Sequence, residues 1–377
     1  MERYILAPDS FKGTLSAEEV CRILREEILR AKPRAEVLSI PVADGGEGSV
    51  DAFLTAAGGR RISVPCHGPH MEEVMGFYGL LPDGTAVVEM AAAAGLPLAG
   101  DRLEPDTATT YGVGELLAAA ADQGARRIIL GLGGSATNDG GCGAAAALGA
   151  GFLDRQGRAF VPAGGDLDRI DRIDLRQQRP LPPLTIMCDI DNPLCGPAGA
   201  SAVFGPQKGA GPELVERLDR NLRHLADVIR RDLGKDILTL PGGGAAGGMG
   251  AGAAAFWNGT LRMGIETVLD TVKFDDLLRG ARLVITGEGR LDSQSLRGKV
   301  ISGVAVRAAR AGVPVAAIVG AVGEGADGIY DSGVCCVFTT NHRPEPFSTA
   351  KLHAEENLRY TIRNLMGFLR AVESRTG

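Results

Sequence analysis

The sequence predicts an α/β fold in two domains, and three observations support this. The chain has 377 residues, which is long for a single hydrophobic core. Hydrophobic residues make up 45% of it, enough to fill buried cores. Short apolar runs alternate with helical patterns near both ends of the chain, whereas hairpin signals interrupt this alternation in the middle.

The first seventy residues carry the alternating pattern. Ser16 and Glu19 have the spacing of a capping box, which indicates that a helix begins there. The expected elements are a strand in RYILAPDS (3–10), a helix around 20–28, a strand at 35–42, a helix at 50–57 and a strand in RRISVP (60–65). This order favours a parallel sheet with helices on its faces.

Hairpin signals mark the middle of the chain. Asp-Gly at 83–84 and Gln-Gly at 156–157 each lie between extended runs, as in a tight turn between antiparallel strands. A helix near 107–122 and a strand at 126–132 are expected between these two turns. The middle is therefore predicted to be a mixed α/β module of different character.

The alternation returns near residue 270. The last part of the chain has strand-length apolar runs and two helical patterns, at 281–286, 302–311, 313–319, 334–339 and 349–370. These patterns predict a Rossmann- or flavodoxin-like parallel-sheet domain built from residues 1–70 and 270–377. Residues 71–269 would form a second α/β domain, containing the hairpins, inserted in the first.

Composition argues against several classes of protein. The net charge is −6, and acidic and basic residues are interspersed, so no nucleic-acid partner is expected. No apolar run reaches about 18 residues, so no membrane span is expected. The first residues lack the pattern of a secretory signal, and the seven cysteines are irregularly spaced. We therefore expect reduced thiols and a cytoplasmic protein, and the sequence is compatible with a homodimer.

Six loops rich in glycine and charged residues follow apolar runs. They lie at 7–14, 43–49, 131–141, 188–196, 203–211 and 286–299. Ligands of open α/β sheets bind outside the carboxyl ends of the strands, so such loops can converge. Together they supply cations, carboxylates and glycine amides, which are the components of a phosphoryl-transfer site. Asp-Gly pairs alone would indicate only turns, but lysine and arginine are not turn formers.

The loop GLGGSATNDGG (131–141) also matches a dinucleotide fingerprint. Gly131, Gly133 and Ala136 have the G-x-G-x-x-A spacing, and Asp154 follows about twenty residues later. A nicotinamide-dependent hydroxy-acid dehydrogenase is therefore an alternative. Two features weaken it: polar residues rather than an apolar helix follow the glycines, and Asp154 lies in a predicted hairpin turn. Neither a P-loop nor the protein-kinase motif set occurs.

Five stretches together resemble the signature stretches of the bacterial type I glycerate kinases, the D-glycerate 2-kinase type. They are LAPDSFKGTLSA, PVADGGEGS, GLGGSATNDGGCG, CDIDNPLCGPAGAS with VFGPQKGA, and ITGEGRLDSQSLRGKV, in the family's order from residue 4 to about 320. The resemblance implies two α/β domains with the active site in the cleft between them. It also implies transfer of the γ-phosphoryl group of ATP, with Mg²⁺, to D-glycerate, giving 2-phosphoglycerate or 3-phosphoglycerate. The sequence does not decide between the two hydroxyls or reveal the preferred phosphoryl donor.

On this interpretation the loops divide the work of phosphoryl transfer. The predicted ATP- and phosphate-binding residues are Gly133, Gly134, Ser135, Thr137, Asn138 and Lys208. Asp189 and Asp191 follow a predicted strand, and its two-residue period would place them on one side, opposite Ile190. Asp189 is favoured as the base and Asp191 as a Mg²⁺ ligand, although the roles could be reversed. Asp44 and Glu47 are rival metal ligands.

Glycerate carries a carboxylate and two hydroxyls, so its site needs cations and hydroxyl donors. The predicted substrate-binding residues are Ser10, Lys12, Arg290 and Lys299, with Lys12 also counted as catalytic. Glu288 and Asp292 are further carboxylate candidates. Outside catalysis, the alternative is a sugar-acid binding protein that holds glycerate without reacting.

Overall fold

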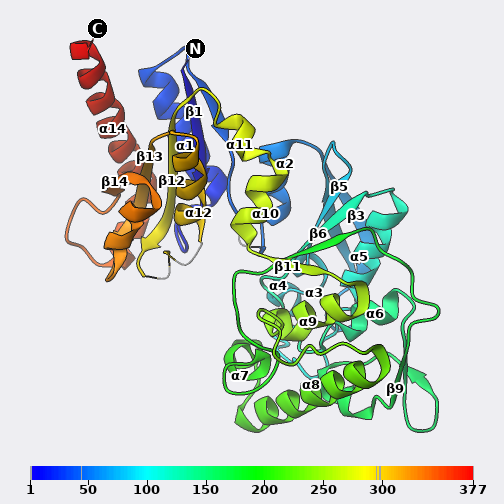
Figure 1. The fold of residues 1–377 in the computed structure, drawn as a ribbon. Coiled ribbons are helices and arrows are strands. Elements are labelled where there is room, and N and C mark those ends of the chain that lie inside the picture. Colours follow the sequence, from blue (N-terminus) through cyan, green and yellow to red (C-terminus); the bar gives the residue numbers. More distant parts are fainter. Residues whose placement is uncertain (1, 44, 294, 297–298, 377) are drawn as a thin grey trace. The chain divides into compact units, whose positions relative to one another are not determined.

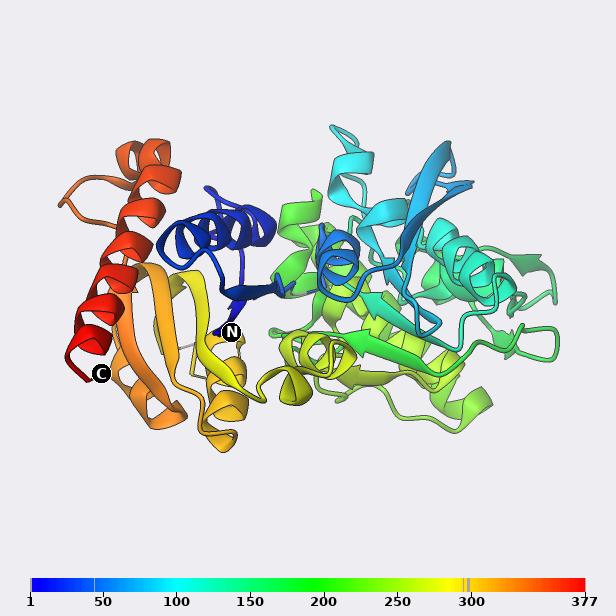
Figure 2. The same cartoon turned by 90° about the horizontal axis from the view of Figure 1, so that it is seen from above.

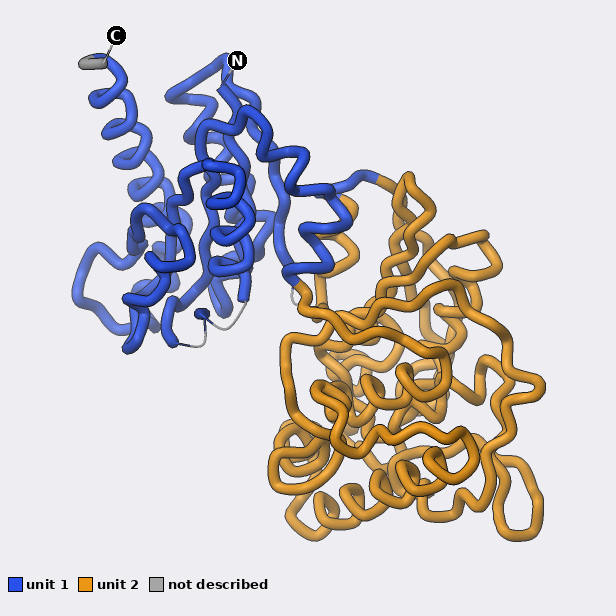
Figure 3. Tube along the Cα trace, in the orientation of Figure 1, with its two compact units in different colours: residues 1–43, 55–58, 265–377 blue, residues 44–54, 59–264 orange. Residues whose placement is uncertain are grey.

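The computed structural model describes residues 2–43, 45–293, 295–296 and 299–376 (Figure 1). The chain divides into two compact units, coloured separately in Figure 3. The first unit comprises residues 1–43, 55–58 and 265–377, and the second comprises residues 44–54 and 59–264. A short segment before residue 55 therefore leaves the first unit and packs with the second.

The first unit is built on a five-stranded parallel sheet with strand order β14-β13-β12-β1-β2 (Figure 1). Its strands are β1 (Arg3–Pro8), β2 (Glu36–Ser39), β12 (Ala281–Leu291), β13 (Val315–Val322) and β14 (Val334–Thr339). Counted along the chain, this is the flavodoxin-like order 2-1-3-4-5, and the direction of winding reverses between β1 and β12.

Helices cover both faces of this sheet (Figure 2). The helices of this unit are α1 (Ala17–Ala31), α10 (Gly264–Thr271), α11 (Phe274–Leu277), α12 (Val300–Arg310), α13 (Phe347–Ala350) and α14 (Ala354–Thr376), with 3-10 turns η3 (Ala326–Ser332) and η4 (Lys351–His353). The predicted capping box starts α1, since Ser16 and Glu19 bond reciprocally. α1 and α14 share one apolar core, to which they contribute Ile23 and Ile362.

A buried carboxylate joins these two helices. The side chain of Glu27 on α1 is fully buried, and it accepts hydrogen bonds from Arg359 (3.0 Å) and Arg363 (2.8 Å) on α14. The guanidinium groups hold the pKa of Glu27 near 2, well below its ordinary value. This pairing supplements the apolar contacts that hold α14 on the sheet.

The second unit contains a six-stranded sheet with strand order β11-β10-β6-β5-β4-β3. Its strands are β3 (Arg60–His67), β4 (Glu73–Leu80), β5 (Thr85–Glu89), β6 (Arg127–Gly131), β10 (Leu184–Met187) and β11 (Thr260–Arg262). The four strands from β5 to β11 are parallel, and β4 runs antiparallel to both its neighbours. The hairpin predicted at residues 83–84 is the β4–β5 turn.

A smaller antiparallel sheet has the order β8-β7-β9, and its β7–β8 turn is the hairpin predicted at residues 156–157. The strands are β7 (Gly151–Leu153), β8 (Ala159–Phe160) and β9 (Arg172–Asp174). The helices of this unit are α2 (Ser49–Ala57, whose last residues belong to the first unit), α3 (Ala91–Ala94), α4 (Leu96–Ala99), α5 (Tyr111–Asp122), α6 (Cys142–Ala147), α7 (Ala200–Phe204), α8 (Pro212–Leu233) and α9 (Ala245–Trp257), with 3-10 turns η1 (Gly164–Arg169) and η2 (Pro206–Lys208).

Two predicted features are wrong. The strand expected at 60–65 is β3, which runs antiparallel to β4 in the second unit instead of joining the parallel sheet of the first. The strand expected at 281–286 continues to Leu291, so Glu288 and Arg290 lie on β12 rather than in a loop. The extension is held by pairing with β13, where Glu288 is opposite Val319 and Arg290 is opposite Ala321. Among the described residues, no helix is long and apolar enough to cross a membrane.

Candidate active site

The carboxyl ends of the parallel strands gather the predicted phosphate and metal residues of the second unit. Gly131, the last residue of β6, is opposite Met187 on β10 and Glu89 on β5. The glycine-rich loop that follows β6 therefore lies beside the segment Cys188–Asp191 that follows β10. Parallel strands bring these segments together although more than forty residues separate them along the chain.

Backbone of the segment 45–48 packs directly against the start of this loop. The Gly133 amide donates to the Gly45 carbonyl (2.9 Å). A Cβ atom at Gly131 would lie 2.4 Å from the Gly45 oxygen, and one at Gly133 would lie 2.5 Å from the Gly46 Cα atom. These glycines are therefore required for a close approach of two backbones, and binding of phosphate by Gly133 stays a prediction.

Glu47 lies at the exposed side of the same loop. Its carboxylate oxygen is 3.5 Å from the position that a Cβ atom would take on Gly134, a residue with left-handed φ (+73°). Glu47 is exposed and thus accessible to a cation. Asp44, the other predicted metal ligand of this segment, lies outside the described residues.

The polar residues 135–139 in the middle of the loop are buried, and a lysine lies beneath them. Lys208 is 2% exposed, and its Nζ donates to the Ser135 hydroxyl (2.9 Å) and the Thr137 carbonyl (2.6 Å). Burial lowers the pKa of Lys208 to about 7, an effect that the nearby Asp139 opposes. Lys208 thus stabilises the loop from below, whereas its predicted contact with phosphate stays a prediction.

The two other predicted side chains of this loop differ in their bonding. Asn138 donates from Nδ2 to the Ser201 hydroxyl (3.1 Å), which ties the loop to α7. The Thr137 hydroxyl is buried and has no hydrogen-bond partner among the described residues. A buried hydroxyl without a partner is costly, so Thr137 is the group of the loop most in need of a ligand.

Asp139 organises the end of the loop, a role that sequence reasoning missed. It is fully buried and accepts hydrogen bonds from the Thr110 amide and hydroxyl (both 2.8 Å) and from the Gly141 and Gly143 amides (3.0 and 3.2 Å). Burial raises the pKa of Asp139, although these four bonds favour its charged form. The signal available in the sequence was an aspartate directly before two glycines, which is common in turns.

Glu89 is a second buried carboxylate that the sequence did not reveal. It ends β5 and accepts hydrogen bonds from the Val50 amide (2.5 Å) and the Gly48 amide. Burial raises the pKa of Glu89 to about 7. These bonds join the first turn of α2, and with it the segment 45–48, to the carboxyl end of β5.

The two aspartates after β10 differ in their surroundings. Asp189 is half-buried, and its Oδ1 accepts a hydrogen bond from the Gly264 amide (2.6 Å), whereas Asp191 is exposed. β10 ends at Met187, so the strand alternation that predicted a shared side does not extend to these residues.

The first unit gathers the predicted substrate residues at the carboxyl ends of β1 and β12. The Asp9 amide donates to the Gly287 carbonyl (2.8 Å), and Asp9 in turn accepts from the Ser10 amide (2.6 Å). A Cβ atom on Gly289 would lie 3.2 Å from the backbone nitrogen of Lys12, so the backbone that follows β1 packs against β12. Lys299 is the N-cap of α12.

Charged side chains surround Glu288 at this end of the sheet. Glu288 is 8% exposed. The charges of Asp9 and Asp292 raise its pKa, and the charge of Lys299 lowers it. Arg290 points to solvent, and its Nε is 3.5 Å from an oxygen of Asp292. The structure therefore groups the predicted residues in two sets, one in each unit, and their union in one cleft stays a prediction.

Comparison with known proteins identifies the family. The model of the glycerate kinase family matches residues 4–370. The chain belongs to the glycerate kinase family. It is 45% identical to glycerate kinase of Bacillus cereus over 368 residues, which cover 96% of this chain and 97% of that one. It is 41% identical to glycerate 2-kinase of Escherichia coli over 372 residues, which cover 97% and 98% of the two chains.

A solved structure of the glycerate kinase family has the same fold. A crystal structure of a Salmonella typhimurium LT2 protein assigned as glycerate kinase 2 superimposes with a TM-score of 0.87. The two chains are 44% identical, and 99% of each is covered. The predicted family and fold class are both confirmed.

Membership of the glycerate kinase family gives no support to the two alternatives, a dehydrogenase and a non-catalytic binding protein. The structure adds a reason against the dinucleotide fingerprint. Asp154 bonds within the β7–β8 turn, where it accepts from the Gln156 amide (2.9 Å) and from Arg158 (2.9 Å). An aspartate engaged in this way is a turn residue rather than a ligand for a ribose.

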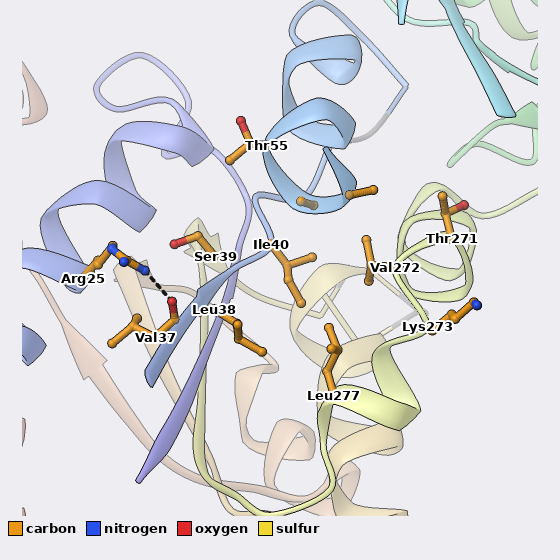
Figure 4. A pocket seen from close by; sticks show the side chains of 12 residues that line it. Arg25, Val37, Leu38, Ser39, Ile40, Thr55, Thr271, Val272, Lys273 and Leu277 are labelled. Atoms are coloured by element: carbon orange, nitrogen blue, oxygen red, sulfur yellow. Dashed lines mark hydrogen bonds between the residues drawn. The ribbon is translucent and has the colours of Figure 1, made fainter. Parts of the chain in front are cut away.

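A pocket in the first unit is lined by none of the predicted site residues (Figure 4). It has a volume of about 490 Å³ and lies along the edge strand β2, the end of α2 and the residues 271–277. Arg25 donates to the Val37 carbonyl on its wall. Its lining mixes aliphatic side chains with Arg25 and Lys273 but includes no carboxylate, so it offers no metal ligand or carboxylate base for phosphoryl transfer.

Proposed function

We propose that this member of the glycerate kinase family transfers the γ-phosphoryl group of ATP to D-glycerate and releases ADP. The observation that carries this proposal is the family match over residues 4–370. The E. coli relative is named a glycerate 2-kinase, which favours 2-phosphoglycerate over 3-phosphoglycerate as the product. The alternative acceptor is the 3-hydroxyl.

The loop after β6 is proposed to bind the phosphates of ATP. The Gly134 amide, the Ser135 hydroxyl and the Thr137 hydroxyl are donors of the kind that phosphate oxygens accept. The buried Thr137 hydroxyl, which lacks a partner among the described residues, supports this role. Lys208 and Asp139 would hold the loop in shape while it binds.

Magnesium is proposed as the metal, and the donor chemistry fits it. Mg²⁺ is usually bound by one or two carboxylates together with water and substrate phosphates. Glu47 and Asp191 are exposed carboxylates near the carboxyl ends of the second-unit strands, and they would hold the ion. When bound, Mg²⁺ offsets the negative charge of the phosphate oxygens.

Glycerate is proposed to bind at the carboxyl ends of β1 and β12. Lys12 and Lys299 can pair with its carboxylate, and the Ser10 hydroxyl can bond to one of its own hydroxyls. Arg290 is exposed and can contribute charge from the rim. Phosphoryl transfer needs this orientation because most of its catalysis comes from positioning and from offsetting charge.

The test is direct. Purified protein is incubated with ATP, MgCl₂ and D-glycerate, ADP formation is followed, and the product is identified by phosphorus NMR. We expect ADP to form only when D-glycerate is present, with 2-phosphoglycerate as the product. Absence of any phosphoglycerate, or equal ADP formation without D-glycerate, would refute the proposal, whereas 3-phosphoglycerate would correct only the acceptor hydroxyl.

A further inference from the structure

Glu288 occupies the topological switch point of the first-unit sheet. β1 leads to β2 on one side, whereas β12 lies on the other side of β1. In open doubly wound sheets, ligands bind outside the carboxyl ends of the strands at such a point. Pro8, the last residue of β1, is paired with Gly287, so Glu288 directly follows the residue aligned with the end of β1.

One oxygen of Glu288 is buried without a partner. The residue is 8% exposed, and its Oε1 accepts no hydrogen bond from any described residue. A hydrogen bond from the Ser295 side chain favours the charged form of the carboxylate. Buried polar atoms are almost always satisfied in native proteins, so an orphaned carboxylate oxygen at a ligand-binding position indicates a group that meets its partner in the complex.

Burial and the nearby carboxylates together raise the affinity of Glu288 for a proton. Burial has the largest effect, and the carboxylates of Asp9, after β1, and Asp292, after β12, act in the same direction. Lys299, at the start of α12, opposes them. The pKa of Glu288 is therefore raised from its ordinary value. A carboxylate accepts a proton more effectively when its pKa lies closer to the working pH.

We propose that Glu288 is the base that accepts the proton of the glycerate hydroxyl during phosphoryl transfer. This inference rests on the proposed function. The hydroxyl oxygen forms a bond to the γ-phosphorus while its O–H bond breaks, and the proton moves to Oε1 of Glu288. The bond between the γ-phosphorus and the bridging oxygen breaks, and that oxygen leaves with ADP.

The structure favours Glu288 over Asp189 for this role. Oδ1 of Asp189 already accepts a hydrogen bond from the Gly264 amide at 2.6 Å, whereas Oε1 of Glu288 has no hydrogen-bond partner among the described residues. The backbone of Lys12 packs against Gly289 of β12. The proposed glycerate-binding residue Lys12 and Glu288 therefore lie at the same end of one sheet. A hydroxyl placed there would supply the partner that Oε1 lacks.

The test compares Glu288→Gln with wild type. The variant keeps the shape of the side chain but cannot take the proton. We expect kcat to fall by about 10²- to 10⁴-fold, the range typical of a lost general base. The dissociation constant of D-glycerate should change by less than about tenfold, and the acidic limb of the kcat–pH profile should disappear from the residual activity. Glu324→Gln, an exposed carboxylate in the loop after β13, is the matched control and should behave as wild type.

Three outcomes would overturn the inference. The first is a Glu288→Gln enzyme with kcat within threefold of wild type. The second is an enzyme with raised KM but unchanged kcat, which would mark a binding residue. The third is loss of the acidic limb in Asp189→Asn together with its retention in Glu288→Gln, which would make Asp189 the base. An inactive wild type would instead refute the proposed function.

A second variant covers a failure of Glu288→Gln to fold, which thermal unfolding would reveal. Glu288→Asp keeps the carboxylate but withdraws it by one methylene. We expect lower kcat and an acidic limb shifted to lower pH, because aspartate has the lower intrinsic pKa. Unchanged kcat with an unshifted limb would also overturn the inference.

Discussion

Replacing Lys208 by methionine should change how the stability of this protein depends on pH. The side chain is buried beneath the glycine-rich loop, where Nζ donates to Ser135 and to the Thr137 carbonyl. Methionine keeps most of the aliphatic length but removes the titrating amine. The variant therefore separates the packing of this side chain from its ionisation.

The magnitude follows from the pKa of Lys208, which burial lowers from 10.5 to about 7. Between these values the unfolded chain holds the proton and the folded protein releases it, so the free energy of unfolding rises with pH. One pKa unit corresponds to about 1.4 kcal/mol, so from pH 7 to 9 this group should add roughly 2 kcal/mol of stability in wild type. Lys208→Met should lack this rise.

Urea unfolding of both proteins at pH 7, 8 and 9 measures the difference. We expect the stability of wild type relative to the variant to increase by roughly 2 kcal/mol over this range. Two parallel profiles, with a constant offset, would show that the lysine keeps an ordinary pKa and would refute the burial argument. Loss of the two bonds to the loop should also raise KM for ATP.

Three further predictions concern buried carboxylates. Glu27→Gln weakens the pairing of α1 with α14, so the free energy of unfolding in urea should fall by roughly 1–3 kcal/mol at pH 7. This deficit should shrink as the pH falls from 4.5 towards 2, where wild-type Glu27 is protonated as well. The raised pKa of Glu89, about 7, means that the folded protein keeps a proton that the unfolded chain loses. Wild-type stability should thus fall by roughly 2–3 kcal/mol from pH 4.5 to 7, and this fall should be missing in urea titrations of Glu89→Gln. Asp139→Asn places an amide among four donors, so thermal unfolding should show a loss of roughly 2–4 kcal/mol, and unchanged stability would contradict the assigned bonds.

Local patterns predicted the elements that local interactions form. The capping box at Ser16 starts α1, and the two turn signals at 83–84 and 156–157 lie between paired strands. The predicted parallel sheet at the two ends of the chain is present in the first unit. For the capping box and the two turns, the residues that decide the structure are neighbours along the chain, whereas the sheet was predicted from the repeated alternation of strand and helix patterns.

Features that depend on distant partners could not be predicted in this way. The extension of β12 to Leu291 depends on pairing with β13. The burial of Lys208, Asp139 and Glu89 depends on packing between segments far apart in sequence, so the sequence did not show that these charged side chains are internal. The glycines at 131 and 133 matched a nucleotide motif, yet their neighbour in space is the backbone at 45–46.

The excursion of residues 44–54 into the second unit limits how this protein can be dissected. A fragment covering only residues 59–264 would appear self-contained along the chain, yet it would lack Gly45 and Gly46, against which the loop after β6 packs. It would also leave the Glu89 carboxylate without the amides of Gly48 and Val50. To be expressed independently, the second unit would need residues 44–54 joined to residues 59–264 by an added linker. A fragment cut at residue 59 would lack part of its own packing.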